Sequence, residues 1–319
     1  SIGNAQRVAV DGHFVAVASS GLGVQILNLN APPTSTGVRS VKRPGAQAVT
    51  AASGIAYAGF DSGSVVSLDL ETGRVLHELS VTNSVIDLAL SGDHLYVLAA
   101  NRLFSVSLSA ATPTLVGSVS FSTQNTPTKR LFVGGGVAYV VHLNGYNTID
   151  VTDPTRPTVL TTGKTAQFGW RHLVSNGSGL GIAAVASGSV TEGDVSLYDL
   201  SDPQKNDVFL TQIPTPGAAN AIAIFNGLAY AADGQAGFQV LNYLPFDAQG
   251  LAPSITLTTS ALQGETEASS PLRLTANATD DIQVRQVEFY IDGERVFTDG
   301  NFPFECRFNA PARSATKTN

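Results

Sequence analysis

The stretch that decides the fold is IAYAGFDSGSVVSLDL (55–70), in which two short apolar strands flank a turn that contains Gly63. The same pattern recurs along the chain, and its last strand ends in a Leu-x-Leu-like step. These last strands are VQILNL (24–29), VVSLDL (65–70), LFSVSL (103–108), NTIDV (147–151), VSLYDL (195–200) and FQVLNY (238–243). The preceding strands align on Val15, Tyr57, Tyr96, Tyr139, Ile182 and Tyr230, with spacings of 42, 39, 43, 43 and 48 residues. A period of this length with four short strands per unit is typical of β-propeller blades.

The strands of each repeat are apolar on both faces, which is expected when each sheet packs between two neighbours. A two-sheet sandwich of similar length would not repeat at a fixed period. We therefore predict an all-β fold with a β-propeller of six blades, and a seventh blade upstream stays possible. Residues 1–3 precede the first repeat and resemble the end of a fourth strand. A strand from the N-terminus is therefore expected to complete the last blade.

From Pro253 onward the strands alternate between apolar and polar residues, as in SITLTTS (254–260) and PLRLTANAT (271–279). Asp292-Gly293 predicts a two-residue hairpin turn. The predicted division is a propeller over 1–247, a linker over 248–253 and a β-sandwich module over 254–319. The module is shorter than a complete sandwich domain of about 100 residues, so we expect it to be incomplete at its C-terminus and the chain to be a fragment of a longer protein.

Two family resemblances support this division. NTIDVTDPTRPTVL (147–160) resembles the LVIVD repeat, a propeller repeat of bacterial surface and secreted proteins in which an Asp-Pro-x-x-Pro turn follows the third strand. Asp in such a turn can hydrogen-bond the backbone, while Pro fixes φ. The stretch from Ala278 to Gly293 resembles a bacterial immunoglobulin-like domain, although Gln283 stands where that family often has Gly. The resemblances imply an exported protein, either extracellular or at the cell surface.

Composition excludes several classes of function. The net charge is −7 and there is no Lys/Arg-rich run, which argues against binding to nucleic acid or to an anionic membrane. No apolar run approaches the roughly 18 residues that a membrane-spanning helix needs. Cys306 is the only cysteine, so an intrachain disulfide is impossible, and its place between Phe304 and Phe308 predicts a buried thiol.

The innermost strands of a propeller bring equivalent positions together around the axis. In this chain those positions carry an unusual share of basic residues. The predicted anion-binding residues at the channel mouth are Arg7, Asp87, Lys129, Arg130, Arg171 and His172. Arg side chains match carboxylates in geometry, so an acidic sugar is a possible ligand. The alternative interpretation is structural, with these side chains paired to Asp87 and to backbone carbonyls.

Other candidate sites rest on weaker patterns. Asp280, Asp281 and Asp292 could hold Ca²⁺, but their spacing fits ordinary turn residues equally well. No cofactor is predicted. His13, His77, His94 and His142 fall at differing repeat positions and are expected to lie at the surface.

The sequence thus predicts a non-enzymatic extracellular binding or scaffold module of a bacterial protein, acting in adhesion or interaction through the propeller face. Its expected partners are other domains or subunits of a surface assembly, or an extracellular glycan or protein. Two alternatives stay open. One is a hydrolase or lyase acting on an anionic polysaccharide, with His172 as base, although glycosidase chemistry needs a second carboxylate beside Asp87. The other is a structural subunit of a surface assembly.

Overall fold

The structure is a computed structural model. It describes residues 3–31, 38–110, 112–123, 129–186, 193–244, 247, 249–261 and 266–310. Residue contacts divide the chain into two compact units, which are described separately. The first comprises Ser1–His172 and Pro203–Asp207, and the second comprises Leu173–Asp202 and Val208–Asn319.

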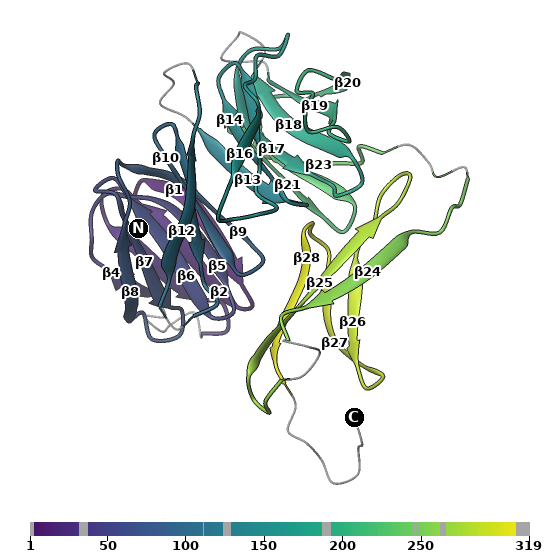
Figure 1. The fold of residues 1–319 in the computed structure, drawn as a ribbon. Coiled ribbons are helices and arrows are strands. Elements are labelled where there is room, and N and C mark those ends of the chain that lie inside the picture. The colour runs from purple at the N-terminus through teal and green to yellow at the C-terminus, as the bar shows by residue number, and fades with distance from the viewer. Residues whose placement is uncertain are drawn as a thin grey trace. The chain divides into compact units, whose positions relative to one another are not determined.

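The first unit contains four antiparallel sheets, each of four strands paired in chain order (Figure 1). The first two sheets consist of β1 (Ala5–Asp11), β2 (Phe14–Ser19), β3 (Gly23–Asn28) and β4 (Val38–Val41), then β5 (Ala46–Ala52), β6 (Ile55–Phe60), β7 (Ser64–Asp69) and β8 (Val75–Ser80). The next two consist of β9 (Val85–Ser91), β10 (His94–Ala99), β11 (Arg102–Ser107) and β12 (Thr114–Ser120), then β13 (Arg130–Gly134), β14 (Val137–His142), β15 (Gly145–Asp150) and β16 (Thr158–Thr161).

Two further sheets continue the pattern. The fifth has four strands, β17 (Trp170–Ser175), β18 (Leu180–Ala186), β19 (Gly193–Asp199) and β20 (Phe209–Pro214), of which β17 begins in the first unit. The sixth has three, β21 (Ala221–Phe225), β22 (Leu228–Ala232) and β23 (Phe238–Leu241), with the 3-10 helix η1 (Gly234–Ala236) before β23. The six sheets correspond one for one to the six predicted repeats, and the propeller prediction is confirmed. The predicted closing strand involves Ser1 and Ile2, which lie outside the described residues.

Apolar residues join each sheet of the first unit to the next. One cluster combines Ile26 of the first sheet with Phe60 and Leu68 of the second, and all three are fully buried. Similar clusters join the second sheet to the third and the third to the fourth. The innermost strands β1, β5, β9 and β13 are successive neighbours. This packing on both faces explains why the strands lack strict apolar-polar alternation.

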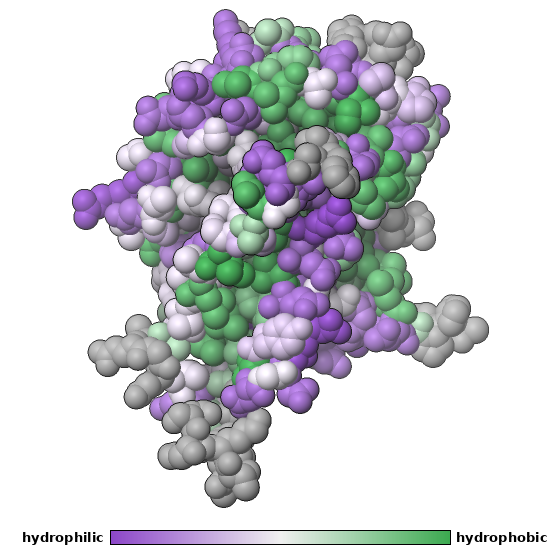
Figure 2. Space-filling view, turned by 90° about the vertical axis from the view of Figure 1, so that its right-hand side faces the viewer, coloured by the Kyte–Doolittle hydropathy of each residue, from purple (hydrophilic) through white to green (hydrophobic). Residues whose placement is uncertain are grey.

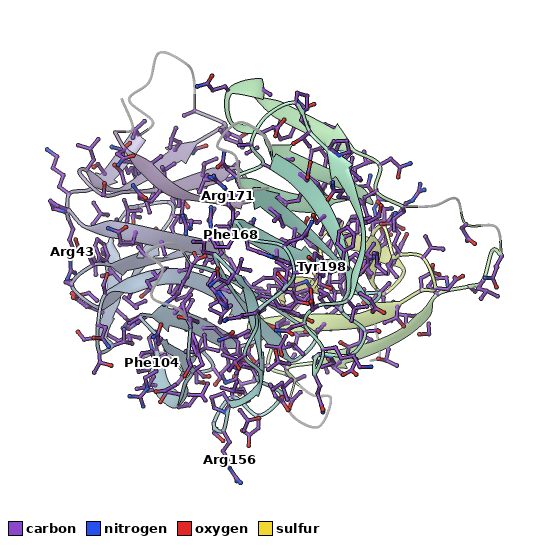
Figure 3. All side chains as sticks on the ribbon, turned by 90° about the horizontal axis from the view of Figure 1, so that it is seen from above. Arg43, Phe104, Arg156, Phe168, Arg171 and Tyr198 are labelled. Atoms are coloured by element: carbon purple, nitrogen blue, oxygen red, sulfur yellow. The ribbon has the colours of Figure 1, made fainter. Side chains whose placement is uncertain are left out.

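The Asp-Pro turns hold neighbouring sheets of the first unit together. Asp153 Oδ1 accepts hydrogen bonds from the Thr155 amide (3.0 Å) and hydroxyl (2.6 Å), as the motif predicts. The carbonyl of Pro154 lies so close to Gly117 of β12 that a side chain at Gly117 would overlap it. Pro203, which belongs to the first unit, contacts the fourth sheet through a hydrogen bond, in which the Thr148 hydroxyl donates to the Pro203 carbonyl at 2.6 Å. Arg156 of the first turn points away from the ribbon (Figure 3) and its side chain is 85% exposed.

The second unit also contains the immunoglobulin-like module. One sheet has the order β24 (Ser254–Thr259), β25 (Pro271–Thr279), β28 (Phe304–Asn309), and the other pairs β26 (Val287–Ile291) with β27 (Glu294–Asp299). Its core contains Ala276, Phe289, Phe304 and Cys306, so the prediction of a buried thiol is confirmed. Burial also raises the pKa of that thiol. Asp292-Gly293 forms the predicted turn, with φ of 51° and 85°.

The predicted domain boundaries stay a prediction, although β23 ends and β24 begins on either side of the expected linker. Residues 311–319, where the module is expected to be incomplete, lie outside the described residues. Among the described residues, no helix is long and apolar enough to cross a membrane. Large apolar side chains do reach the surface of the second unit, among them Phe238 and Ile255, and Figure 2 shows apolar atoms exposed on the face it presents.

Within the second unit, the module packs against the hairpin turns of the fifth and sixth sheets. Gln283 Oε1 accepts a hydrogen bond from the Tyr243 hydroxyl at 2.9 Å, and Gln283 Nε2 donates to the Gly227 carbonyl at 3.4 Å. The Asn226 amide donates to the Gly300 carbonyl at 3.0 Å. The residue that departs from the immunoglobulin-like family pattern, Gln283, is therefore one of the residues that attach the module to the propeller sheets.

Candidate functional site

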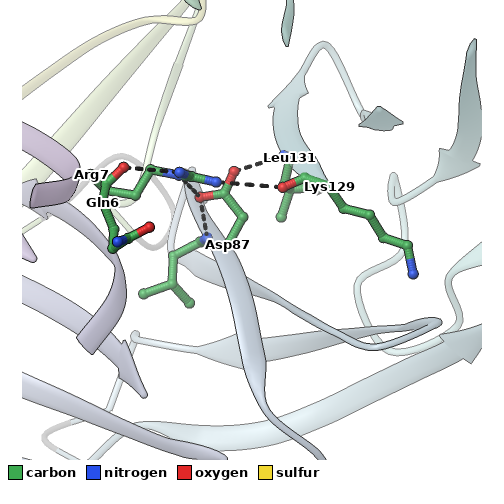
Figure 4. A network of polar contacts seen from close by, with 6 residues as sticks. Gln6, Arg7, Asp87, Lys129 and Leu131 are labelled. Atoms are coloured by element: carbon green, nitrogen blue, oxygen red, sulfur yellow. Dashed lines mark hydrogen bonds and ion pairs between the residues drawn. The ribbon is translucent and has the colours of Figure 1, made fainter. Parts of the chain in front are cut away.

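The predicted channel-mouth residues come from the starting ends of the innermost strands. Arg7 lies on β1, Asp87 on β9 and Arg130 on β13, with Lys129 directly before β13. These four belong to the first unit, and one polar network joins Arg7, Asp87 and the carbonyl of Lys129 (Figure 4).

Asp87 is at the centre of this network. Its Oδ1 accepts from Arg7 Nε at 3.2 Å and from the Leu88 amide at 3.2 Å, while its Oδ2 accepts from the Leu131 amide at 3.0 Å. The side chains of Arg7 and Asp87 are only 16% and 8% exposed. Both carboxylate oxygens are therefore already engaged, so Asp87 is poorly placed to move a proton in catalysis.

Arg7 extends from the first sheet to the third and fourth. Besides Asp87, it donates from Nη1 to the Gln6 carbonyl at 2.9 Å and from Nη2 to the Lys129 carbonyl at 3.5 Å. Most of its hydrogen-bonding capacity is used within the protein. The contacts of Arg7 and Asp87 are therefore those of the structural interpretation, in which the basic side chains pair with Asp87 and with backbone carbonyls.

Lys129 is bound by backbone and amide oxygens, as the structural interpretation expects for these side chains, and not by Asp87. Its side chain is 4% exposed and turns away from Asp87 (Figure 4), donating from Nζ to the Ala100 carbonyl at 2.9 Å and to Asn101 Oδ1. Burial lowers the pKa of the Lys129 ammonium. The carbonyl and amide oxygens of the turn between β10 and β11 bind this charge, so its ammonium is not directed at a ligand.

Arg130 is the basic residue of this group whose charge is not bound locally. Its guanidinium makes no hydrogen bond or ion pair with any residue that the structure describes. Burial lowers its pKa to about 10, an effect that Asp87 opposes and Arg7 increases. The guanidinium remains charged at neutral pH. An anion beside it would recover part of the solvation that burial has removed.

A hollow of about 300 Å³ opens at the same ends of the innermost strands. Its lining consists of Gln6, Arg7, Gln47, Ser84, Val85, Ile86 and Lys129. Amide, hydroxyl and cationic groups predominate and the lining contains no carboxylate, so the hollow suits a polar or negatively charged ligand. Ser84 was not among the residues selected from the sequence, because it precedes β9 and lies outside the aligned positions.

Arg171 and His172 follow Trp170 on β17, and both take part in other interactions. Figure 3 labels Arg171. The contacts described around Arg7 and Asp87 involve Gln6, Leu88, Lys129 and Leu131. Of the other four predicted residues, Arg7 and Asp87 are paired, Lys129 points away from Asp87, and Arg130 stands beside the pair.

The acidic residues proposed for Ca²⁺ are turn residues in the structure. Asp280 Oδ1 accepts from the amides of Ile282 and Gln283 at 3.0 and 3.1 Å, and Asp292 forms the hairpin turn after β26. Across the described ranges, no three His, Cys, Asp or Glu side chains come together. Asp281 is thus not part of a cluster of metal ligands among these residues.

One histidine differs from its predicted setting. His142 was expected at the surface, but it is 3% exposed at the end of β14, where its Nε2 hydrogen-bonds Oδ1 of the buried Asn147 at 3.2 Å. The sequence feature that could have predicted this burial is Asn147. It is a polar residue in a largely apolar strand, and a buried polar side chain needs a hydrogen-bond partner.

The comparisons with known proteins agree with the motifs. The LVIVD repeat family matches residues 2–28 and 127–165, and the bacterial Ig domain family matches residues 253–319. The chain therefore carries LVIVD repeats followed by a C-terminal bacterial Ig domain. No curated protein matches it. Among 1422 matching chains of solved structures is the crystal structure of the computationally designed Ika8 protein, with a TM-score of 0.55 and 11% identity over 96% of this chain and 89% of that one. At this identity the likeness concerns the fold alone.

Proposed function

We propose that this chain is a non-enzymatic, extracellular binding module of a bacterial surface or secreted protein, and that it recognises an anionic group of its partner at the starting ends of the innermost strands. One observation carries the proposal. Arg130 holds a desolvated positive charge without a hydrogen-bonded acceptor among the described residues; it does not itself line the polar hollow, but its chain neighbour Lys129 and its electrostatic neighbour Arg7 do.

The local charges favour an anion. Arg7, Lys129 and Arg130 supply three positive charges, whereas Asp87 supplies one negative charge and is already bound on both oxygens. A carboxylate of the partner would meet a planar guanidinium that can donate two parallel hydrogen bonds. The low exposure of the surrounding side chains weakens the competition from water and strengthens such a contact.

The catalytic alternative finds less support in this geometry. A hydrolase or lyase would need a base or a nucleophile free to react. The carboxylate of Asp87 is held by a guanidinium and two backbone amides. LVIVD repeats with a bacterial Ig domain are in keeping with an exported binding protein, and adhesion through the propeller face is the role that we favour.

Isothermal titration calorimetry with tetragalacturonate, and with the uncharged maltotetraose as the matched sugar, tests the proposal. We expect tetragalacturonate alone to bind, with an affinity that falls as salt increases. Arg130→Gln should weaken binding by about tenfold or more, since a charge-assisted hydrogen bond contributes about 1.5–3 kcal/mol. Arg74→Gln, which removes an exposed charge from the second sheet, is the control.

Equal binding of both sugars, or an affinity that Arg130→Gln leaves unchanged, would contradict the anion site. Release of new reducing ends from polygalacturonate would instead support the enzyme. Binding to neither sugar would favour the structural subunit, whose faces would be covered by protein neighbours in the native assembly.

A further inference from the structure

A second hollow of about 290 Å³ lies in the first unit, where β12, β14 and β16 end. It is lined by Ser122, Thr123, His142, Asn144, Thr162, Gly163 and Lys164. The lining thus contains three hydroxyl groups, an amide, an imidazole and an ammonium, but no carboxylate. None of these residues belongs to the group around Arg130, so the inference does not rest on the function proposed above.

The floor of this hollow is held in one arrangement by Asn147. Its Oδ1 accepts from the Gly163 amide at 2.8 Å and lies 3.2 Å from His142 Nε2, while its Nδ2 donates to the Ser122 carbonyl at 3.1 Å. These bonds fix the amide orientation and tie the ends of three strands together. Asn147 is fully buried, so water does not compete for these contacts.

The same bonds determine which nitrogen of His142 carries its proton. Because Asn147 Oδ1 can only accept, Nε2 of His142 must be the donor. Nδ1 is then left as an acceptor, and it is buried without a hydrogen-bond partner among the described residues. Burial lowers the pKa of His142, Asn147 partly opposes this, and the nearby Lys129 lowers it further. At neutral pH the imidazole is uncharged and lacks one hydrogen bond, which is costly for a buried group.

Lys164 supplies the positive charge at the rim. Its side chain is exposed, and it has no hydrogen bond or ion pair within the part of the chain that the structure describes. The segment that carries it is well fixed. Trp170 Nε1 donates to the Thr165 hydroxyl at 2.7 Å and to the Gln167 carbonyl at 3.1 Å, and the Thr165 amide donates to the Asn144 carbonyl at 3.0 Å.

We propose that this hollow binds a monosaccharide acid, with the sugar carboxylate paired to Lys164 and the sugar ring against the imidazole of His142, whose enclosed Nδ1 reports on the ligand without contacting it. The hydroxyls of Ser122, Thr123 and Thr162 surround the remaining hydroxyl groups of the sugar. A volume of about 290 Å³ is at the lower limit of ligand pockets, which span about 300–1,000 Å³. A hollow of that size fits one sugar residue but cannot enclose a long oligosaccharide.

The test uses the whole chain labelled with ¹⁵N at histidine and observes the imidazole nitrogens by NMR. Glucuronate, galacturonate and N-acetylneuraminate are the probes, and glucose is the uncharged comparison. We expect at least one acid to bind saturably at millimolar concentrations and to shift Nδ1 of His142, assigned from His142→Gln. Glucose should bind at least tenfold more weakly.

Lys164→Gln should weaken this binding by about tenfold, as loss of a close charge pair does. Lys42→Gln, which removes an exposed Lys charge directly after β4, should leave the affinity unchanged. Because Lys164 is exposed, its variant should fold even if His142→Gln does not. The proposal is overturned if none of the acids moves the His142 signal, if glucose binds equally well, or if Lys164→Gln has no effect. An Arg130→Gln variant that still shifts His142 separates this site from the other hollow.

Discussion

The attachment of the immunoglobulin-like module to the last two sheets can be tested at a single residue, Gln283. Its amide connects the module to the Tyr243 hydroxyl and to the Gly227 carbonyl. Gln283→Ala removes both contacts without adding backbone freedom, whereas Gly, the usual residue of the family, would add it. We expect the variant to fold but to loosen the module from the sheets.

The structure sets the size of the effect. Tyr243 is 5% exposed, and burial raises its pKa to about 12, so its hydroxyl is neutral and dry. Leaving a buried polar group unpaired costs about 1–3 kcal/mol. Asn176 still hydrogen-bonds this hydroxyl, and the bond to Gly227 is long at 3.4 Å. The cost should therefore be about 1 kcal/mol, which is roughly a fivefold change in an equilibrium constant.

Hydrogen exchange at the Asn226 amide measures this directly, because that amide donates to Gly300 of the module. It should exchange about fivefold faster in Gln283→Ala, while the exposed control Gln249→Ala should leave it unchanged. Tyr243→Phe completes a double-mutant cycle with an expected coupling of about 1 kcal/mol. A coupling within about 0.3–0.5 kcal/mol of zero, the range of additive sites, would refute the assignment of Gln283 as an attachment residue.

Three further outcomes follow from other contacts. Asp87→Asn breaks an ion pair in which both side chains are largely buried, so the unfolding free energy should fall by about 3 kcal/mol. Denaturant unfolding followed by fluorescence of the single tryptophan measures it, and an unchanged denaturation midpoint would show that the pair contributes nothing. Gly177→Ala places a Cβ into the ring of Phe302, whereas Gly293→Ala has open space at a similar positive φ. Gly177→Ala should therefore lower the melting temperature more. Equal decreases would mean that backbone strain alone, and not the clash with Phe302, sets the cost. Burial raises the pKa of Tyr139 to about 12, above the unfolded value of about 10. The stability that this buried, neutral phenol contributes is complete below pH 10 and is lost toward pH 12, and a Tyr139→Phe variant that loses as much unfolding free energy as the wild type between pH 10 and pH 12 would contradict that.

The repeats made most of the fold predictable. Each sheet needs apolar residues on both faces, so strands such as VVSLDL (65–70) carry a signal at every position, and the Gly-containing turns fix where each strand ends. Equivalent positions of a repeat must occupy equivalent places. For the same reason Arg7 and Asp87 could be expected to meet, although they are separated by two repeats of sequence.

The contacts of long side chains were less predictable. Lys129 has enough reach to meet either Asp87 or the turn at Ala100, and no repeat pattern encodes which way its side chain turns. The buried position of His142 depends on a single partner, Asn147, in the neighbouring strand. Gln283 stood out only as a departure from a family pattern, and its role required the turns of two other sheets to be in place.

The module contacts and the proposed ligand sites lie at opposite ends of the repeating sheet, and this difference can be tested. The module contacts the fifth and sixth sheets at the turns that follow their innermost strands, at Asn176 and Gly227. The hollows of the first unit lie where innermost strands begin and where second strands end, at the opposite end of an antiparallel sheet. Attachment of the module and the proposed ligand binding therefore use different ends of the repeat, and no residue should be required for both.

Gln283→Ala should accordingly leave the affinities for tetragalacturonate and for the sugar acids unchanged while it speeds exchange at Asn226. Arg130→Gln and Lys164→Gln should have the reverse effect. If loosening the module also weakened sugar binding, the two ends would be energetically coupled. The immunoglobulin-like module would then regulate the binding face in addition to being anchored to the sheets.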